Sequence, residues 1–113
     1  MIYGDGQQTR DFVYVTDVVE ANLLAAATPG ADGLVFNVST GRGISILELW
    51  ETIQGIAGTS IVPTFADKRP GDVQHSRASY TRAREILGYR PTVALADGLR
   101  RTLAWSREAD DCR

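Results

Sequence analysis

The chain has 113 residues, a formal net charge of −2 and 43% hydrophobic residues, as expected of one small globular domain. This charge gives no electrostatic basis for binding nucleic acid or an anionic membrane, and no apolar run approaches the ~20 residues of a membrane span. One cysteine, Cys112, and one histidine, His75, are too few for a disulfide framework or a four-ligand zinc site. We therefore expect a cytoplasmic protein without a metal site.

The first element in chain order combines a Gly4-Asp5-Gly6 turn, an arginine and a short apolar run. This pattern predicts a strand over residues 12–15 and then a helix, because Asp17 and Glu20 have the spacing of a capping box. Apolar residues at helical spacing predict that one side of this helix faces a core. That side consists of Val18, Val19, Asn22, Leu23, Ala26 and Ala27.

The middle of the chain predicts a buried strand and then the most regular amphipathic helix of the sequence. Residues 34–38 are β-forming residues between turn signals, and residues 39–43 predict a flexible loop. Ser45 and Glu48 form a second capping box, and Gly58 is expected to end the helix. Its apolar side consists of Ile46, Leu49, Trp50, Ile53, Ile56 and Ala57.

An edge strand and a third helix are predicted next. Residues 61–65 read as a strand, which Pro63 confines to the edge of a sheet. Ser79 is expected to cap a helix that ends at Gly88.

A fourth helix is predicted over residues 95–107, and residues 108–113 are expected to fray. This helix contains Gly98, whose cost of ~1 kcal/mol relative to alanine indicates close packing at that position. The predicted fold class is therefore α+β, a small lobe over residues 1–107 with about four helices and three short strands. These strands do not alternate with helices as they would in a complete doubly wound sheet.

Two arginines stand in constrained backbone settings. Arg10 lies between the glycine turn and a predicted strand, and Arg69 precedes Pro70. Guanidinium groups on separate loops suit the forked recognition of a diphosphate, and the nearby Asp72 carboxylate suits a pair of ribose hydroxyls. The alternative is that Arg10 with Asp11, and Arg69 with Asp72, form local salt bridges at turns. Spacing alone leaves both interpretations open.

Four sequence motifs follow one another along the chain. They are YGDGQQTRDFVYVTDVVEAN (residues 3–22), FNVSTG (residues 36–41), RPGDVQHS (residues 69–76) and LGYRP (residues 87–91). Together they resemble the C-terminal half of the NAD-dependent epimerase/dehydratase family, the extended short-chain dehydrogenases that act on nucleotide sugars. The resemblance is strongest to UDP-glucose 4-epimerase-like proteins and covers nearly the whole chain.

The resemblance implies a substrate-binding role for four residues. Arg10 and Arg69 match the family arginines that contact the substrate diphosphate from two sides. Asp72 matches the aspartate that hydrogen-bonds the nucleotide ribose. Ser76 falls beside the C2 substituent of the sugar, where a small residue would leave room for an N-acetyl group. The resemblance also implies a UDP-sugar as the ligand, attachment to an NAD-binding Rossmann domain, and the homodimer that family members often form.

The catalytic and cofactor-binding motifs of that family do not occur in this sequence. Lys68 is the only lysine and Thr64 stands four positions before it, so no Tyr-x-x-x-Lys pair exists. A Gly-x-x-Gly-x-x-Gly turn is also absent. We therefore expect no catalytic residue and no NAD-binding residue in this chain, with NAD bound elsewhere in the full-length enzyme.

These observations predict the nucleotide-sugar binding portion of an NAD-dependent sugar 4-epimerase or dehydratase, a partial enzyme that is inactive alone. In the whole enzyme, hydride would pass between the sugar C4 and NAD. Two alternatives stay open, namely one half of a split enzyme that needs a separate NAD-binding chain, and a non-catalytic nucleotide-sugar binding module. The sequence does not decide which sugar or nucleotide binds, or whether the reaction is epimerisation, dehydration or decarboxylation.

Overall fold

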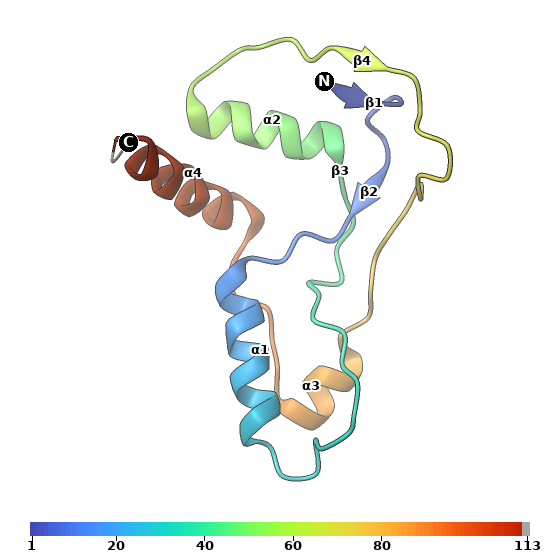
Figure 1. Cartoon of the computed structure of the whole chain (residues 1–113), viewed down its shortest axis with the longest axis vertical. Helices are drawn as coiled ribbons and strands as arrows, with labels where there is room; N and C mark the ends of the chain where they lie inside the picture. Colours follow the sequence, from blue (N-terminus) through green and yellow to red (C-terminus); the bar gives the residue numbers. More distant parts are fainter. Residues whose placement is uncertain (112–113) are drawn as a thin grey trace.

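The computed structural model describes residues 1–111 and shows the small α+β fold that the sequence predicted. Short strands and longer helices follow one another along the chain (Figure 1). They are β1 (Ile2–Tyr3), β2 (Thr9–Arg10), α1 (Val15–Ala27), β3 (Ile44–Ser45), α2 (Ile46–Ala57), β4 (Phe65–Ala66), α3 (Thr81–Leu87) and α4 (Leu95–Asp111).

The strands form two small ladders that join distant parts of the chain. β1 pairs in parallel with β4, with Ile2 opposite Phe65. β2 pairs antiparallel with β3, with Arg10 opposite Ile44. The strand expected over residues 61–65 is thus reduced to its last position and the residue after it.

Two other strand predictions are wrong. Residues 12–14 form no ladder, and Val15 already belongs to α1. Residues 34–38 also have no regular secondary structure in the described part of the chain. β propensity reflects packing on a half-buried sheet surface, and here Phe36 and Val38 find that packing against a helical core instead.

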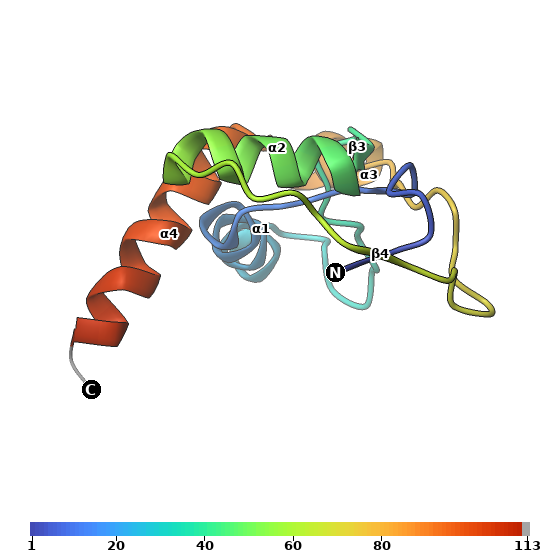
Figure 2. The same ribbon diagram turned by 90° about the horizontal axis from the view of Figure 1, so that it is seen from above.

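The described residues divide into two regions, which are visible in Figure 1. We call α1 and α3, with the segments around Ala31 and Tyr89, the core lobe; α2 and α4 form a separate helical pair. The radius of gyration is 16.8 Å, against about 13 Å for a compact domain of this length. Figure 2 shows that α4 runs out of the flat layer that the other elements form.

The buried core lies in the core lobe. Its centre is Tyr89, which has no exposed surface and meets Tyr80 edge to face at 5.9 Å between ring centroids. Burial, and then the nearby negative charges of Asp17 and Asp11, raise the pKa of Tyr89 to about 12. The buried members of the cluster are Ala21, Ala31, Ala83, Leu87 and Tyr89.

Asp17 is not the N-cap of α1, because the cap position is Tyr14, which makes no side-chain cap hydrogen bond. The Asp17 side chain is buried and accepts hydrogen bonds from the Thr92 backbone N (3.1 Å), the Thr92 hydroxyl (2.8 Å) and the Val93 N (3.2 Å). Pointing this carboxylate inward turns the expected apolar side of α1 outward. Val19 is 51% exposed and Leu23 is 61% exposed.

The predicted ends of α2 are confirmed. The Ser45 hydroxyl accepts from the Glu48 N at 3.0 Å, and Gly58 closes the helix with a left-handed φ of 68°. Gly88 ends α3 with a φ of 74°, as expected, but the cap position of α3 is Tyr80 and not Ser79.

α4 is longer than predicted and packs closely at its start. It continues to Asp111, beyond the expected end at residue 107. Fraying of the tail stays a prediction, and residues 112–113 lie outside the described part. A Cβ on Gly98 would lie 3.0 Å from Cδ2 of Tyr14, which confirms the close packing expected there. Within residues 1–111, no helix is both long and apolar enough to cross a membrane.

Candidate functional site

The glycine turn near the start of the chain is fixed against the beginning of α2. Gly6 has a φ of 76°, and a Cβ on it would lie 2.6 Å from Cγ of Leu47, so only glycine fits. The Leu47 N donates to the Gly6 carbonyl at 3.1 Å, and the Ile46 N donates to the Gln8 carbonyl at 3.1 Å. This anchoring sets the position of β2 and therefore of Arg10.

A cavity of about 420 Å³ opens between the segments of β1 and β2 and the loop of residues 69–72. Three of the four predicted site residues, Arg10, Arg69 and Asp72, line it. They come from β2 and from a distant turn in which the Asp72 N donates to the Arg69 carbonyl at 3.2 Å. The fold thus gathers residues about 60 positions apart in the sequence into one site.

Arg10 forms the main ion pair of this site. Its Nη2 lies 2.7 Å from Oδ1 of Asp72, and its Nη1 donates to the carbonyls of Thr9 (2.8 Å) and Val73 (2.7 Å). The two side chains keep 29% and 28% of their surface exposed. Among residues 1–111 neither of the local salt bridges considered above forms, since Asp72 pairs with Arg10 and not with Arg69.

Arg69 lies over an aromatic ring that the sequence analysis missed. Its Cζ is 3.8 Å from the ring centroid of Tyr3, a cation–π contact. Tyr3 is in β1, immediately before the glycine turn, and keeps 36% of its surface exposed. The sequence did carry a signal for Tyr3, because this aromatic residue directly precedes the glycine turn that leads to Arg10.

Ser76 is not among the residues that line this cavity. It is exposed, and its backbone N donates to the Thr9 carbonyl at 3.0 Å, next to the Arg10 contacts. The neighbouring His75 ring places Nδ1 3.0 Å from the Thr9 hydroxyl. The structure therefore puts Ser76 near the site, at its border and not inside it.

A second cavity of about 280 Å³ shares Tyr3, Gln8 and Asp72 with the first. The Gln8 side chain donates to the Tyr3 carbonyl at 2.7 Å, and Lys68 donates to the Gln74 side chain at 3.0 Å. This second cavity carries charge of both signs, because Lys68, Asp5 and Asp72 line it together. The guanidiniums of Arg10 and Arg69 suit an anion with two phosphoryl groups, and the carboxylate of Asp72 suits a hydroxyl donor.

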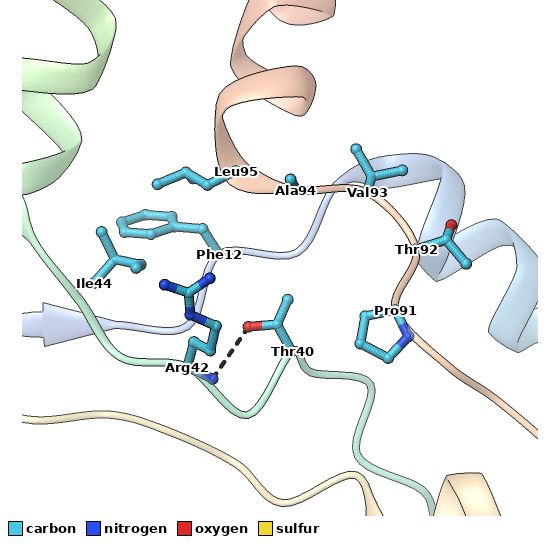
Figure 3. A pocket seen from close by; sticks show the side chains of 9 residues that line it. All are labelled: Phe12, Thr40, Arg42, Ile44, Pro91, Thr92, Val93, Ala94 and Leu95. Atoms are coloured by element: carbon cyan, nitrogen blue, oxygen red, sulfur yellow. Dashed lines mark hydrogen bonds between the residues drawn. The ribbon is translucent and has the colours of Figure 1, made fainter.

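Another cavity of about 280 Å³ lies at the junction of the two regions (Figure 3). Its walls are mostly apolar, with Phe12 and Leu95 facing Arg42, whose N donates to the Thr40 hydroxyl at 3.2 Å. Thr40 is held by Asp11, which accepts from the Thr40 N and hydroxyl at 2.9 and 2.6 Å and from the Gly41 N at 2.9 Å. With a single charged wall residue, this cavity suits an anionic diphosphate less well than the one at Arg10.

No group of three or more histidine, cysteine, aspartate or glutamate side chains that could hold a metal ion occurs in the described ranges.

Comparisons with known proteins place this geometry in context. The family model described as GDP-mannose 4,6 dehydratase matches residues 1–102. A UDP-glucose 4-epimerase of Mycolicibacterium smegmatis is 46% identical over 106 residues, which cover 94% of this chain and 34% of that protein.

Solved structures of sugar-nucleotide 4-epimerases are also similar to this chain. The UDP-glucose 4-epimerase of Thermotoga maritima with UDP-glucose superposes with a TM-score of 0.90 at 44% identity, over 96% of this chain and 34% of that one. A UDP-glucuronic acid 4-epimerase of Bacillus cereus, in complex with UDP-glucuronic acid and NAD, gives a TM-score of 0.81 at 36% identity, over 87% and 32%. The chain thus spans about a third of the length of the relatives it matches.

Proposed function

This chain belongs to the family described as GDP-mannose 4,6 dehydratase, and we propose that its residues 1–107 form the nucleotide-sugar binding portion of an NAD-dependent sugar 4-epimerase or dehydratase. The observation that carries this proposal is the shared cavity of Arg10, Arg69 and Asp72. Its volume of about 420 Å³ lies within the usual range of ligand pockets. Relatives bound to UDP-glucose and UDP-glucuronic acid support a UDP-sugar as the ligand.

Each charged residue of the cavity has a chemical task in this proposal. Arg10 is held in place by two backbone carbonyls and offers its remaining N–H groups to one phosphoryl group of the diphosphate. Arg69 takes the other phosphoryl group. Asp72 uses Oδ1 for Arg10, which leaves its second carboxylate oxygen to accept from a ribose hydroxyl.

Tyr3 adds a stacking surface for the nucleobase. In the free chain the Arg69 guanidinium covers the Tyr3 ring at 3.8 Å. When the diphosphate draws Arg69 away, the ring face becomes available to a base, and such stacking is worth about 1–3 kcal/mol per base. We assign Ser76, which lies outside the cavity lining, to the sugar side of the ligand.

The residues of this chain do not fit NAD, because neither a Gly-rich dinucleotide turn nor a Tyr-x-x-x-Lys pair is present in the sequence. We assign to this chain the binding and positioning of the sugar nucleotide. Contacts to the nucleotide, remote from the reacting carbon, position that carbon for the reaction, and the residues that make them take no part in bond making or breaking. Alone, the chain is expected to bind without turnover.

A partner portion that binds NAD, in the same polypeptide or a separate one, is favoured by the outer face of α1. Val15 and Leu23 are each 61% exposed and Val19 is 51% exposed, at helical spacing on one side. Val35, from the segment without regular structure, is 78% exposed. An apolar face of this kind is typical of a surface that packs against another body.

Calorimetric titration of the 113-residue chain with UDP-glucose, UDP and UMP tests the binding role. We expect saturable binding that is weakest for UMP, and a loss of at least about tenfold in Arg10→Gln and Arg69→Gln, because each removes a charge-assisted hydrogen bond. Arg84→Gln, an exposed arginine of α3 outside the cavity, is the matched control and should bind as the unaltered chain does. Absence of binding heat, or an equal loss in the control, would contradict the proposal.

A further inference from the structure

The helical pair has a half-buried apolar surface, part of which stays open between the two helices. α2 carries the most regular apolar side of the sequence, and the residues of that side are half-buried, with none fully buried. An amphipathic helix in a folded domain normally buries such a side against a neighbouring layer. α4 covers only part of it, because Leu103 is half-buried and Ala104 is exposed.

A groove of about 510 Å³ runs between the two helices. α2 contributes Thr52, Gly55 and Ile56, which are neighbours at spacings of three and four on one helical ridge. α4 contributes a continuous stripe along its length, made of Ala96, Arg100, Leu103, Ala104 and Arg107. A groove between two such ridges has the shape that accepts a third helix.

The composition of the groove defines its occupant further. Ile56 and Leu103 provide an apolar floor, and small residues such as Gly55 and Ala104 allow close approach of another backbone. Within the described part of the chain, the lining contains two arginines and no carboxylate. Arg100 and Arg107 lie seven residues apart, which is about 10.5 Å along the helix axis.

Arg100 is partly engaged in the free chain, since it pairs with Asp97 at 2.7 Å. Both side chains of that pair are more than half exposed, at 61% and 57%. Exposed pairs of this kind contribute little free energy, so a carboxylate of a docked helix can compete for the guanidinium.

We propose that the groove between α2 and α4 docks an amphipathic α-helix from outside this chain, with carboxylates seven residues apart beside its apolar stripe. The apolar floor supplies affinity, and the two arginines supply direction and selectivity against basic helices. This surface is separate from the Arg10 cavity and does not depend on nucleotide binding.

A pair of designed peptides provides the test. The first is a helical 18-residue peptide with an apolar stripe and glutamates seven positions apart, and the second carries lysines at those two positions. The tryptophans of α2 and α4, Trp50 and Trp105, report binding by fluorescence, and calorimetry gives the stoichiometry. We expect one glutamate peptide per chain and at least about tenfold weaker binding of the lysine peptide.

The variant Arg100→Glu/Arg107→Glu should reverse this preference while leaving UDP-glucose binding unchanged, which separates the test from that of the proposed function. Arg101→Glu is the matched control, because Arg101 is on the same helix but lies 5.6 Å from the Tyr14 ring, away from the groove. Equal binding of the two peptides, or the same reversal in the control, would overturn the proposal. A stable dimer of the chain that Leu103→Asp dissociates would overturn it as well, because the groove would then be filled by a second copy.

Discussion

In the core lobe, Asp17 is 3% exposed and its carboxylate receives three hydrogen bonds from the Thr92–Val93 segment. In the Arg10 cavity, Asp72 keeps 28% of its side-chain surface exposed and uses one carboxylate oxygen for its arginine. The first carboxylate is saturated by its own chain, whereas the second retains acceptor capacity toward solvent. Two aspartates in the same chain are thus expected to have different roles: Asp17 stabilises the fold and Asp72 binds the ligand.

The largest change in unfolding free energy is expected from the loss of the buried Asp17 carboxylate. We expect Asp17→Ala to lower the free energy of unfolding by about 3 kcal/mol, because it removes three hydrogen bonds to a buried carboxylate that tie α1 to the Thr92–Val93 segment. Urea denaturation measures it. Asp97→Ala, which removes the exposed pair with Arg100, is the control and should cost under about 1 kcal/mol. Equal costs would show that the burial of Asp17 carries no special weight.

Gly6→Ala tests whether the glycine turn that positions Arg10 is held rigidly against Leu47, even though the side chains of Arg10 and Asp72 are partly exposed. The alanine would meet a positive φ and the Leu47 side chain together, so we expect a loss of about 3 kcal/mol in unfolding free energy. Gly30→Ala is the matched control, since Gly30 has a φ of 82° but no atom near its Cβ position. It should cost only about 1 kcal/mol. If both variants lose the same amount, the contact with Leu47 does not restrain the turn.

Alkaline pH probes the core lobe through Tyr89. The pKa of Tyr89 is raised from 10.0 to about 12, so the folded state favours the neutral phenol. This contribution is complete below pH 10 and is lost as the pH rises through 12, which lowers the unfolding free energy by about 2 kcal/mol over that interval. Thermal denaturation of the chain and of Tyr89→Phe over this range checks it. The phenylalanine variant should lack this part of the pH dependence.

The smallest effect on stability is expected at Asp72. Asp72→Asn removes the charge of a pair that is more than a quarter exposed on both sides, so we expect under about 1 kcal/mol in unfolding free energy. UDP-glucose binding should nevertheless fall about tenfold, because an amide is a weaker acceptor for a ribose hydroxyl. A stability loss as large as that of Asp17→Ala, with binding intact, would reverse the roles assigned to the two carboxylates.

Elements whose deciding interactions are local could be predicted from the sequence. Ser45 and Gly58 fix the ends of α2 through backbone groups within one turn of the helix, and the structure confirms them. Asp17 was misinterpreted because its partners lie 75 and 76 positions away, and no local spacing carries that information. The inverted face of α1 follows from the same error.

The candidate site shows the same division. Arg10, Arg69 and Asp72 were selected from their turn contexts, and the structure brings them into one cavity. The pairing of Arg10 with Asp72 and the cover that Arg69 provides for Tyr3 could not be predicted, because both depend on the register between β1 and β4 and on the turn that follows.

The bonds of Asp11 and Asp17 also constrain the order in which the chain can fold. Each carboxylate holds a threonine hydroxyl and two successive backbone N–H groups, at Thr40–Gly41 and at Thr92–Val93. They close chain loops of 29 and 75 residues, and loop-closure entropy makes the longer one the costlier to form. During synthesis, the core lobe therefore cannot complete its packing until residue 93 has left the ribosome.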